Sequence, residues 1–369
     1  NCIRNENLYP VYEKVRYISK ETYEKWFRAH PISGDIIFVN KGTPGRICFC
    51  PENIDFCIAQ DMMAFRVNSS VLYNKYLLAV LRSREMQEQI RITSVGDTIP
   101  HFKKEFLKEL TIPLPPMDVQ QIIGDYYFKL SEKIELNKKI NENLEQQAQA
   151  LFKSWFVDFE PFKDGEFVDS ELGMIPKGWR VVCLGEVTKQ VTEKVGNRED
   201  VTVLSPVNSG ELVLSEEYFT KQVFSKNLSK YLIVNPLSFA YNPARINIGS
   251  IGLNEYDFVG CVSPVYVVFK CEPNYHYFFD FYKRTAVFKD EVALRAIGGV
   301  RQSLGYDDFS LIKTIYPTPD VVAEFNNLYL KMKEVITRND IQNNKLTTLR
   351  DSLLPKLMSG ELKINNFNR

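Results

Sequence analysis

Two long stretches of the chain share one pattern of hydrophobic and polar positions. Apolar residues recur at spacings of four and three over 119–156 and again from residue 321 onward, which predicts two long α-helices, each with a coiled-coil seam. The first seam consists of Val119, Ile123, Tyr126, Leu130, Ile140, Leu144 and Leu151, with the polar members Lys133, Asn137 and Gln147. The second seam consists of Val321, Phe325, Leu328, Met332, Val335, Asn339, Gln342, Leu346, Leu349 and Leu353.

A proline-rich segment precedes each helix. These segments, 111–116 and 314–319, superpose at an offset of 203 residues, whereas the two seams superpose at an offset of 202. Self-similarity over this length predicts an internal duplication, in which a globular domain leads into a long helix.

Each half of the chain has the pattern of a mixed α/β domain before its helix. In the first half we expect strands at 35–39 and 62–67, a glycine turn at 42–45 and a helix over 73–92. The second half repeats this order, with expected strands at 258–262 and 265–269 and an expected helix over about 275–294.

The connectivity predicts the architecture. Because a compact domain usually begins and ends at neighbouring points, the second helix should run back beside the first. The expected fold is therefore α/β (α+β), with two mixed domains separated by two long antiparallel coiled-coil helices in a pseudo-twofold dumbbell. Residues 163–203 would align before residue 1, so the first domain is expected to be truncated at its N-terminal side. The expected parts are the first domain 1–118, the central helix 119–157, the second domain 158–316 and the C-terminal helix 317–369.

Asn137 and Asn339 hold equivalent polar positions in the two seams. A buried asparagine at such a position lowers stability but fixes the register of the helices. An exposed one near the middle of a helix would have no such role. The pattern leaves both interpretations open.

Composition narrows the class of protein. With 44% hydrophobic residues, 25% charged residues and a net charge of zero, the chain is typical of a soluble protein of two or three domains, so any nucleic-acid surface would have to be local. No apolar run reaches the roughly 20 residues of a membrane-spanning helix and no leader pattern is visible. We therefore expect a cytoplasmic protein without a membrane partner.

The seven cysteines are scattered, which favours reduced thiols. Cys48, Cys50 and Cys57 form a loose cluster, but it lacks the paired spacing and the histidines of a zinc site. We interpret these three as small apolar residues on a strand rather than as metal ligands.

Two similar domains held at a fixed separation suit a target that also repeats along a line. Half-sites on one face of duplex DNA recur about every 34 to 36 Å, and a helix of about 38 residues is roughly 57 Å long. The predicted target is a pair of short DNA sequences separated by an unread spacer of fixed length.

Specific motifs add a family resemblance. The sequences of 148–162 and 169–179 closely resemble the central region of the specificity (S) subunit of type I restriction-modification systems, and 349–361 is similar to the closing helix of that family. Pro-Leu-Pro-Pro at 113–116 resembles the family's usual exit from a target recognition domain. The short first domain and the looser second exit at 316–319 depart from the pattern.

The resemblance implies a non-catalytic DNA-recognition subunit. Two target recognition domains would each read one half of a bipartite site in double-stranded DNA, with the paired helices as a ruler. Two methyltransferase (M) subunits would dock on the chain, and translocase-endonuclease (R) subunits would complete the enzyme. S-adenosylmethionine would be bound by M, and ATP with Mg by R, so no cofactor and no metal is expected in this chain.

Motifs for catalysis are missing from the sequence, which agrees with this interpretation. It contains no Asn/Asp-Pro-Pro-aromatic turn of an amino-methyltransferase and no P-loop. Asp158, Glu160 and Lys163 superficially suggest a nuclease, but a cap and packed turn at a helix end explain them better. The aromatic cluster Phe152, Trp155, Phe156, Phe159 and Phe162 could stack on single strands, although helical spacing favours packing against the second domain.

Base reading requires Arg, Lys, Asn or Gln side chains that reach the major groove, while hydroxyl groups, backbone amides and lysines hold phosphates. Glycine-flanked loops that carry such groups occur at equivalent places in the two halves. The predicted DNA-binding residues of the first half are Lys41, Thr43, Arg46, Arg91, Ser94 and Thr98. Those of the second half are Asn242, Arg245, Asn247, Arg295, Arg301, Gln302 and Ser303. For the first half, a plain hairpin turn and a helix C-cap followed by a strand remain alternatives.

Other functions also fit the sequence. A stand-alone bipartite DNA-binding module, or the specificity region of a fused restriction-modification enzyme, would have the same domains and helices. A coiled-coil scaffold that does not bind DNA is a further alternative, and it would lack salt-dependent retention of duplex DNA.

Overall fold

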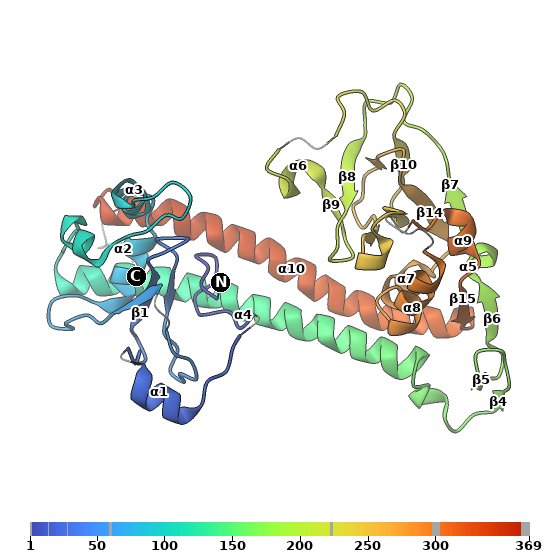
Figure 1. Cartoon of the computed structure of the whole chain (residues 1–369), viewed down its shortest axis with the longest axis horizontal. Helices are drawn as coiled ribbons and strands as arrows, with labels where there is room; N and C mark the ends of the chain where they lie inside the picture. Colours follow the sequence, from blue (N-terminus) through green and yellow to red (C-terminus); the bar gives the residue numbers. More distant parts are fainter. Residues whose placement is uncertain are drawn as a thin grey trace. The chain divides into compact units, whose positions relative to one another are not determined.

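The computed structural model describes residues 2–13, 15–27, 29–58, 61–221, 224–296 and 303–362. The chain forms two compact units (Figure 1). Unit 1 comprises residues 1–143 and 335–369, and unit 2 comprises residues 144–334. Each unit contains one mixed domain and a part of each of two 40-residue helices, α4 (Met117–Phe156) and α10 (Pro319–Met358). The predicted combination of mixed α/β domains with two long helices is confirmed.

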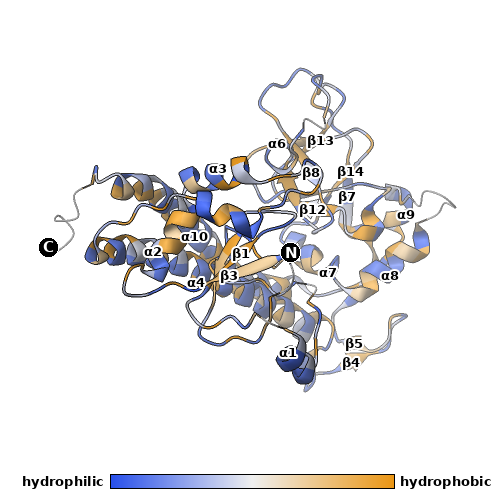
Figure 2. Cartoon of the chain, turned by 60° about the vertical axis from the view of Figure 1, so that its left-hand side comes forward, coloured by the Kyte–Doolittle hydropathy of each residue, from blue (hydrophilic) through white to orange (hydrophobic). Residues whose placement is uncertain are grey.

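The domain of unit 1 is built on an antiparallel three-stranded sheet of order β2-β1-β3. The elements are α1 (Lys20–Trp26), β1 (Ile36–Val39), β2 (Ile47–Phe49), β3 (Met62–Phe65), α2 (Asn74–Arg82), α3 (Arg84–Thr93) and the 3-10 helix η1 (Lys104–Glu109). β1 is buried on both faces, which explains its unbroken apolar sequence. Figure 2 shows the hydrophobic character of β1 and β3. One face packs on α2 and α4, and the other faces loops.

Unit 2 contains two four-stranded sheets, of order β12-β11-β14-β7 and β10-β13-β8-β9. The elements of the first sheet and its helices are α5 (Leu184–Val187), β7 (Thr188–Val191), β11 (Ser238–Tyr241), η3 (Ile246–Ile248), β12 (Ile251–Leu253), β14 (Val267–Cys271), α7 (His276–Tyr282), α8 (Ala286–Arg295) and α9 (Tyr306–Ser310). The second sheet and its helix are β8 (Thr202–Pro206), β9 (Leu212–Leu214), α6 (Ser215–Tyr218), β10 (Leu232–Val234) and β13 (Gly260–Val262). The remaining elements are η2 (Glu160–Phe162) and the strand pairs β4 (Phe167–Val168) with β5 (Ile175–Pro176) and β6 (Arg180–Cys183) with β15 (Lys313–Tyr316).

The internal duplication is visible in the helix boundaries. The pairs α2 and α7, α3 and α8, η1 and α9, and α4 and α10 each begin at residue numbers 202 apart. β1 with its partner β2 corresponds to β11 with its partner β12, and both pairs are antiparallel. Repeated elements thus occupy the same order in both units.

Each helix predicted as continuous over 73–92 and 275–294 is in fact two helices, so that prediction was wrong. Ser83 ends α2 and caps α3, where its Oγ accepts a hydrogen bond from the Met86 amide at 3.2 Å. Thr285 caps α8 in the same way, accepting from the Phe288 amide at 3.3 Å. Both residues have extended backbone, as an N-cap requires, so the chain turns between the two helices.

The predicted seam of α4 is correct at Ile123 and Asn137 but wrong by one position at two other places. Lys133 and Ile140 are exposed, whereas their neighbours Ile134 and Asn141 are buried. In α10 the exposed Leu349 and the buried Leu354 show the same change of phase. The buried positions follow the 3.6-residue period of an ordinary α-helix. A strict heptad drifts from that period by about 20° every seven residues, which amounts to one residue over these lengths.

The two units differ at one edge of the repeated sheet. In unit 2, β7 pairs with β14, and β6 with β15. Within the described residues of unit 1, β3 has no counterpart of β7. A groove of about 490 Å³ lies there instead, lined by Phe65, Leu77 and Leu107 among others. In unit 2, Leu184 and Val187 line the corresponding space, of which about 10 Å³ remains. No helix among the described residues has the length and apolar character needed to cross a membrane.

Candidate nucleic-acid interface

In unit 1, the loop at 40–46 connects β1 to β2 and carries three of the predicted DNA-binding residues, Lys41, Thr43 and Arg46. The loop is closed at its base, where the Val39 amide donates to the Arg46 carbonyl at 2.9 Å. Gly42 and Gly45 have φ angles of 82° and 86°, which other residues rarely adopt. The predicted hairpin turn is therefore present, and it leaves the Lys41 side chain exposed.

The second predicted loop of unit 1 lies directly beside the first. The Gly42 amide donates to the Pro100 carbonyl at 2.8 Å, and the Phe102 amide donates to the Asn40 carbonyl at 2.7 Å. Phe102 is fully buried and anchors the second loop in the core. The exposed Thr98 thereby belongs to one surface with the 40–46 loop.

Arg91 and Ser94 are held by their own helix. Arg91 lies in the last turn of α3 and forms a bidentate pair with Glu88, at 2.8 and 2.6 Å. The Ser94 hydroxyl donates to the Ile90 carbonyl at 2.7 Å, and Ser94 is the C-cap of α3. The helix C-cap alternative is thus correct for Ser94, while the expected strand after it is reduced to a single bridge between Val95 and His101.

In unit 2, the loop at 242–250 connects β11 to β12, the position equivalent to 40–46. The Asn242 side chain accepts a hydrogen bond from the Ala244 amide at 3.1 Å, which fixes the first turn. The Ser250 amide donates to the Arg245 carbonyl at 3.1 Å, so the loop closes on itself. Arg245 and Asn247 are exposed on this loop.

The second predicted loop of unit 2 also approaches the first. The Leu304 amide donates to the Pro243 carbonyl at 3.1 Å, the counterpart of the bond between Phe102 and Asn40 in unit 1. Ser303 is exposed next to this junction. Arg301 and Gln302 lie outside the described residues. Arg295 ends α8, where it pairs with Glu291 and donates to the Leu311 carbonyl at 3.4 Å.

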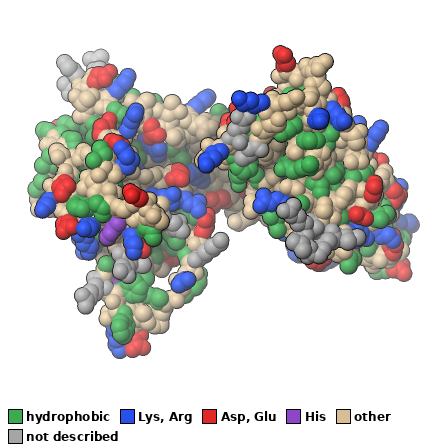
Figure 3. All heavy atoms as spheres, turned by 45° about the horizontal axis from the view of Figure 1, so that its top comes forward, with side chains coloured by type: hydrophobic (Ala, Val, Ile, Leu, Met, Phe, Trp, Pro, Cys, Tyr) green, Lys and Arg blue, Asp and Glu red, His purple; other side chains and the backbone are tan. Residues whose placement is uncertain are grey.

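Positive and negative side chains are mixed on the surface. On the face drawn in Figure 3, Lys and Arg side chains are interspersed with Asp and Glu side chains. This distribution agrees with the net charge of zero. Any contact with an anionic polymer therefore depends on particular loops rather than on a uniformly basic face.

Comparisons with known proteins find similarity to one family. The sequence model described as the type I restriction modification DNA specificity domain matches residues 1–146. The MjaIX specificity subunit of Methanocaldococcus jannaschii is 28% identical over 305 residues, which cover 80% of this chain and 70% of that protein. The HindI specificity subunit of Haemophilus influenzae is 25% identical, with 89% and 86% covered. The chain is therefore similar to type I restriction enzyme specificity subunits, by the family model over residues 1–146 and by these two relatives over most of its length.

A solved structure supports the fold of this chain. The crystal structure of a type I restriction-modification S subunit from M. genitalium matches 96% of this chain and 90% of that chain with a TM-score of 0.57. The sequence identity is 16%, so the match concerns the fold alone.

The aromatic cluster at the end of α4 is part of a core. Phe152 and Phe156 are buried and pack on Phe278 and Phe325 of unit 2 at ring separations of 5.1 to 5.8 Å. Trp155 is partly buried against the same cluster. The packing interpretation is confirmed for these residues.

The acidic residues at the end of α4 form local ion pairs. Asp158 accepts from Lys153 at 2.5 Å, and Glu160 accepts from Lys163 at 2.7 Å. Phe159 between them has a φ of 55°, which turns the chain at the helix end. This is the packed turn that the sequence favoured over a nuclease site.

Two cysteines of the unit 1 cluster belong to the sheet. Cys48 lies on β2 and Cys50 directly follows it, and both are buried with Ile37 and Val39. Burial raises the pKa of the Cys50 thiol to about 12. Their burial agrees with the interpretation of these two residues as small apolar residues of the sheet.

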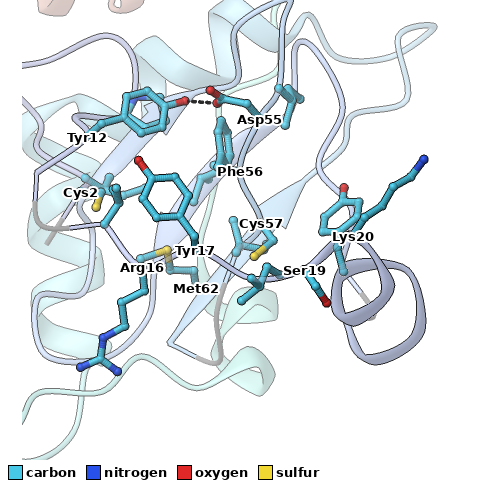
Figure 4. A pocket seen from close by; sticks show the side chains of 18 residues that line it. Cys2, Tyr12, Arg16, Tyr17, Ser19, Lys20, Asp55, Phe56, Cys57 and Met62 are labelled. Carbon is cyan, nitrogen blue, oxygen red and sulfur yellow. Dashed lines mark hydrogen bonds between the residues drawn. The ribbon is translucent and has the colours of Figure 1, made fainter.

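A cavity of about 790 Å³ lies on the same face of this sheet (Figure 4). Its lining includes Ile37, Phe56 and Met62, and the Tyr12 hydroxyl donates to Asp55 at 2.6 Å at its rim. In unit 2, the second sheet covers the equivalent face. The cavity thus reflects a difference in how the two units cover their sheets.

Proposed function

We propose that this chain is a type I restriction specificity subunit, that it binds double-stranded DNA and that each unit reads one half of a bipartite site. The observation that carries the proposal is the pair of equivalent but unlike loops. The 40–46 and 242–250 loops connect equivalent strands, and each is joined by a backbone hydrogen bond to a second loop. Their side chains differ, as two different half-sites would require.

Arg46 and Arg245 are the base-reading candidates that the fold supports best. Each lies on the loop between two paired strands, and within the described part of the chain neither is paired with a carboxylate as Arg91 and Arg295 are. An arginine can bind guanine with two hydrogen bonds in the major groove. Lys41 is proposed to contact phosphate.

The proposed partners are two methyltransferase subunits and, in the complete enzyme, translocase-endonuclease subunits. The chain itself would be non-catalytic. S-adenosylmethionine would be bound by the methyltransferase subunits, and ATP with Mg by the translocase. Because such a complex acts on host DNA, we expect it in the cytoplasm.

A binding experiment tests the proposal. The chain, co-expressed with its methyltransferase subunit, is incubated with a randomised duplex library, and the retained DNA is sequenced. Two enriched sequences at a fixed separation are expected, with retention that falls steeply with salt because counterions are released. Arg46→Ala should relax one of the two sequences and Arg245→Ala the other, each by about 1–3 kcal/mol at a base-reading position. Retention without any enriched sequence would contradict bipartite reading.

Co-purification separates the alternatives. A stand-alone DNA-binding module would bind the library without a methyltransferase subunit and would not retain one. A specificity subunit should retain the methyltransferase subunit through several washes. A DNA-free scaffold would retain no duplex at any salt concentration.

The two long helices are proposed to set the unread spacer. Inserting seven residues into each helix, at positions opposite one another, would add roughly 10 Å, or about 3 base pairs. The spacer between the enriched sequences should lengthen, or binding should be lost. An unchanged spacer would contradict the ruler role.

A further inference from the structure

A buried lysine in unit 2 joins two loops that the sequence does not connect. Lys283 follows α7, and its side chain is 1% exposed. Its ammonium group pairs with Asp280 at 2.6 Å and donates to the carbonyls of Gly210 and Ile251 at 2.6 and 3.1 Å. Ile251 is the first residue after the 242–250 loop, and Gly210 lies in the 207–211 turn between β8 and β9.

Unit 1 contains the same arrangement with a different residue. Arg82, at the end of α2, donates to the carbonyls of Asn7 and Ile47 at 2.5 and 2.6 Å. Ile47 follows the 40–46 loop as Ile251 follows the 242–250 loop. By the 202-residue offset, Arg82 corresponds to Arg284 and not to Lys283. The contact is thus made in both units, although the residue that makes it differs.

Removing a charge from water is unfavourable unless hydrogen bonds and an opposite charge compensate. Lys283 has both. Its ion-pair partner Asp280 lies in α7, and its two carbonyl acceptors lie in the 207–211 turn and directly after the 242–250 loop. An apolar residue could fill the same volume but could not bind two carbonyls from separate loops. The lysine therefore fixes the position of the 207–211 turn relative to the 242–250 loop.

The turn and the loop approach each other closely. Gly249 has a φ of 92°, and a Cβ at this position would lie 2.9 Å from the Asn208 carbonyl oxygen. The Ser250 hydroxyl donates to the Pro206 carbonyl at 2.8 Å. Asn208 and Ser209 are exposed at the tip of the turn.

The turn and the loop border a cavity of about 310 Å³ with both polar and apolar lining residues. Asn208 and Ser209 line it from the turn, and Asn247 lines it from the loop. Lys289 adds a cationic side chain, and Arg284 adds a second one that is paired with Asp280 at 2.5 Å. Amide, hydroxyl and cationic groups together match the edges of bases and the phosphates of a duplex.

We infer that the 207–211 turn is a third DNA-contacting segment of unit 2, in which Asn208 and Ser209 contact the half-site read by the 242–250 loop, with Lys283 as the positioning residue. The inference rests on the proposed function. Arg82 is the corresponding positioning residue for the 40–46 loop in unit 1. An asparagine at the tip of the turn can bind adenine with two hydrogen bonds.

The test uses the chain in complex with its methyltransferase subunit and the same randomised duplex library. The double variant Asn208→Ala/Ser209→Ala removes only exposed groups and should fold normally. We expect about a tenfold loss of discrimination at positions of one half-site, with the other half-site unchanged. The matched control is Asn235→Ala, an exposed asparagine near the opposite end of β11, which should leave both half-sites unchanged.

Lys283→Met and Lys283→Arg test the positioning role. The methionine variant should relax the same half-site as the double variant, and the arginine variant should restore part of the discrimination because it can again donate to both carbonyls. Arg82→Met should relax the other half-site. A general loss of stability would weaken the reading of both half-sites equally. It would not make the Lys283 variant affect one half-site and the Arg82 variant the other.

The outcomes separate the two proposals. If the unaltered complex enriches no sequence, the proposed function fails. If it enriches a bipartite site but the double variant reads it unchanged, or weakens both half-sites equally, the third segment is wrong while the proposed function stands. If Lys283→Met does not fold, as judged by circular dichroism, the double variant decides alone.

Discussion

Asn137 of α4 donates a side-chain hydrogen bond to Asn343 of α10 at 2.9 Å within unit 1. A second bond runs from Asn339 to Asn141 at 2.8 Å. Adding 202 to the numbers of Asn137 and Asn141 gives those of Asn339 and Asn343, so each bond is the image of the other under the internal repeat. All four residues are buried. Of the two interpretations left open by the sequence, burial is correct, and the pairing fixes the antiparallel register of this helix segment.

The asparagine pairs allow a prediction about stability. Replacing Asn137 by leucine removes the donor to Asn343 and leaves a buried amide with fewer partners, so we expect a loss of about 1–3 kcal/mol in the free energy of unfolding. Asn343→Leu should have a similar effect. The double variant should lose less than the sum, because both polar groups are then absent.

Chemical denaturation of the four proteins measures this double-mutant cycle. Asn344→Leu, at an exposed neighbouring position of α10, serves as the control and should change stability by less than about 0.5 kcal/mol. Strictly additive losses would show that the two amides do not act as a pair.

The one-residue phase change along α4 gives a second prediction. Ile134 is 4% exposed and Ile140 is 37% exposed. Ile134→Lys places a charge in the core and should destabilise the protein by several kcal/mol. Ile140→Lys should change the free energy of unfolding by less than about 0.5 kcal/mol. The strict heptad predicts the opposite ranking, so thermal or urea denaturation of the two variants decides between the two helix phases.

The two long helices could be predicted from the sequence, but the positions that are buried along their whole length could not. Leucines at heptad positions outweigh small and polar residues when a seam is chosen by hydrophobicity alone. Ala148 and Asn141 are nevertheless buried in the structure. The small Ala148 side chain lies in a core, and the Asn141 side chain accepts a hydrogen bond from the Asn339 amide. Such partners come from a segment about 200 residues away and leave no local signal.

The breaks at Ser83 and Thr285 could have been predicted from local signals, because serine and threonine favour the N-cap. The surrounding apolar pattern is continuous, and it concealed them. We predict that Ser83→Ala and Thr285→Ala each lower the free energy of unfolding by about 1 kcal/mol. Ser69→Ala, at an exposed loop position, is the control and should have little effect. Equal stability of all three variants would show that the caps contribute nothing measurable.

The candidate loops were found from glycine-flanked basic and polar residues, and the structure places each pair side by side. Two features could not be predicted from the sequence. The pairing of Arg91 with Glu88 is local, but many surface arginines lie near an acid without forming such a pair. The contacts of Lys283 with Gly210 and Ile251 join distant segments. A lysine at the end of an apolar helix gives no indication of which carbonyls it will bind.

Thiol reactivity gives a fourth prediction. Burial raises the pKa of Cys50 to about 12 and that of Cys261 to about 11. Since the thiolate is the nucleophile, iodoacetamide at pH 8 should not modify these two residues until the protein unfolds. Cys183 is only partly buried and should react faster. Peptide mass spectrometry after timed labelling measures the three rates, and equal rates would contradict the burial of Cys50 and Cys261.

The same shifts predict a direction for the pH dependence of stability. A thiol with a raised pKa stays protonated in the folded state while it ionises in the unfolded state. The folded protein therefore binds more protons above pH 9, and stability should fall as the pH rises from about 9 toward 11. Cys261→Ala should reduce the slope of the unfolding free energy against pH in that window.

The pairing of Arg91 with Glu88 predicts how this arginine can contribute to DNA binding. The guanidinium lowers the pKa of the Glu88 carboxyl through two hydrogen bonds, so the pair is charged on both sides at neutral pH and nearly neutral in sum. A phosphate must compete with Glu88 for Arg91. Glu88→Gln should remove this competition, raise affinity for duplex DNA at low salt and steepen the salt dependence by up to about one counterion. Glu85→Gln removes the same charge from the same helix without releasing Arg91. The contribution of Arg91 is therefore the gain in DNA affinity of Glu88→Gln beyond that of Glu85→Gln. If the two variants bind DNA equally, Arg91 does not contact the DNA backbone, and the 40–46 loop is the remaining candidate for the proposed phosphate contacts of unit 1.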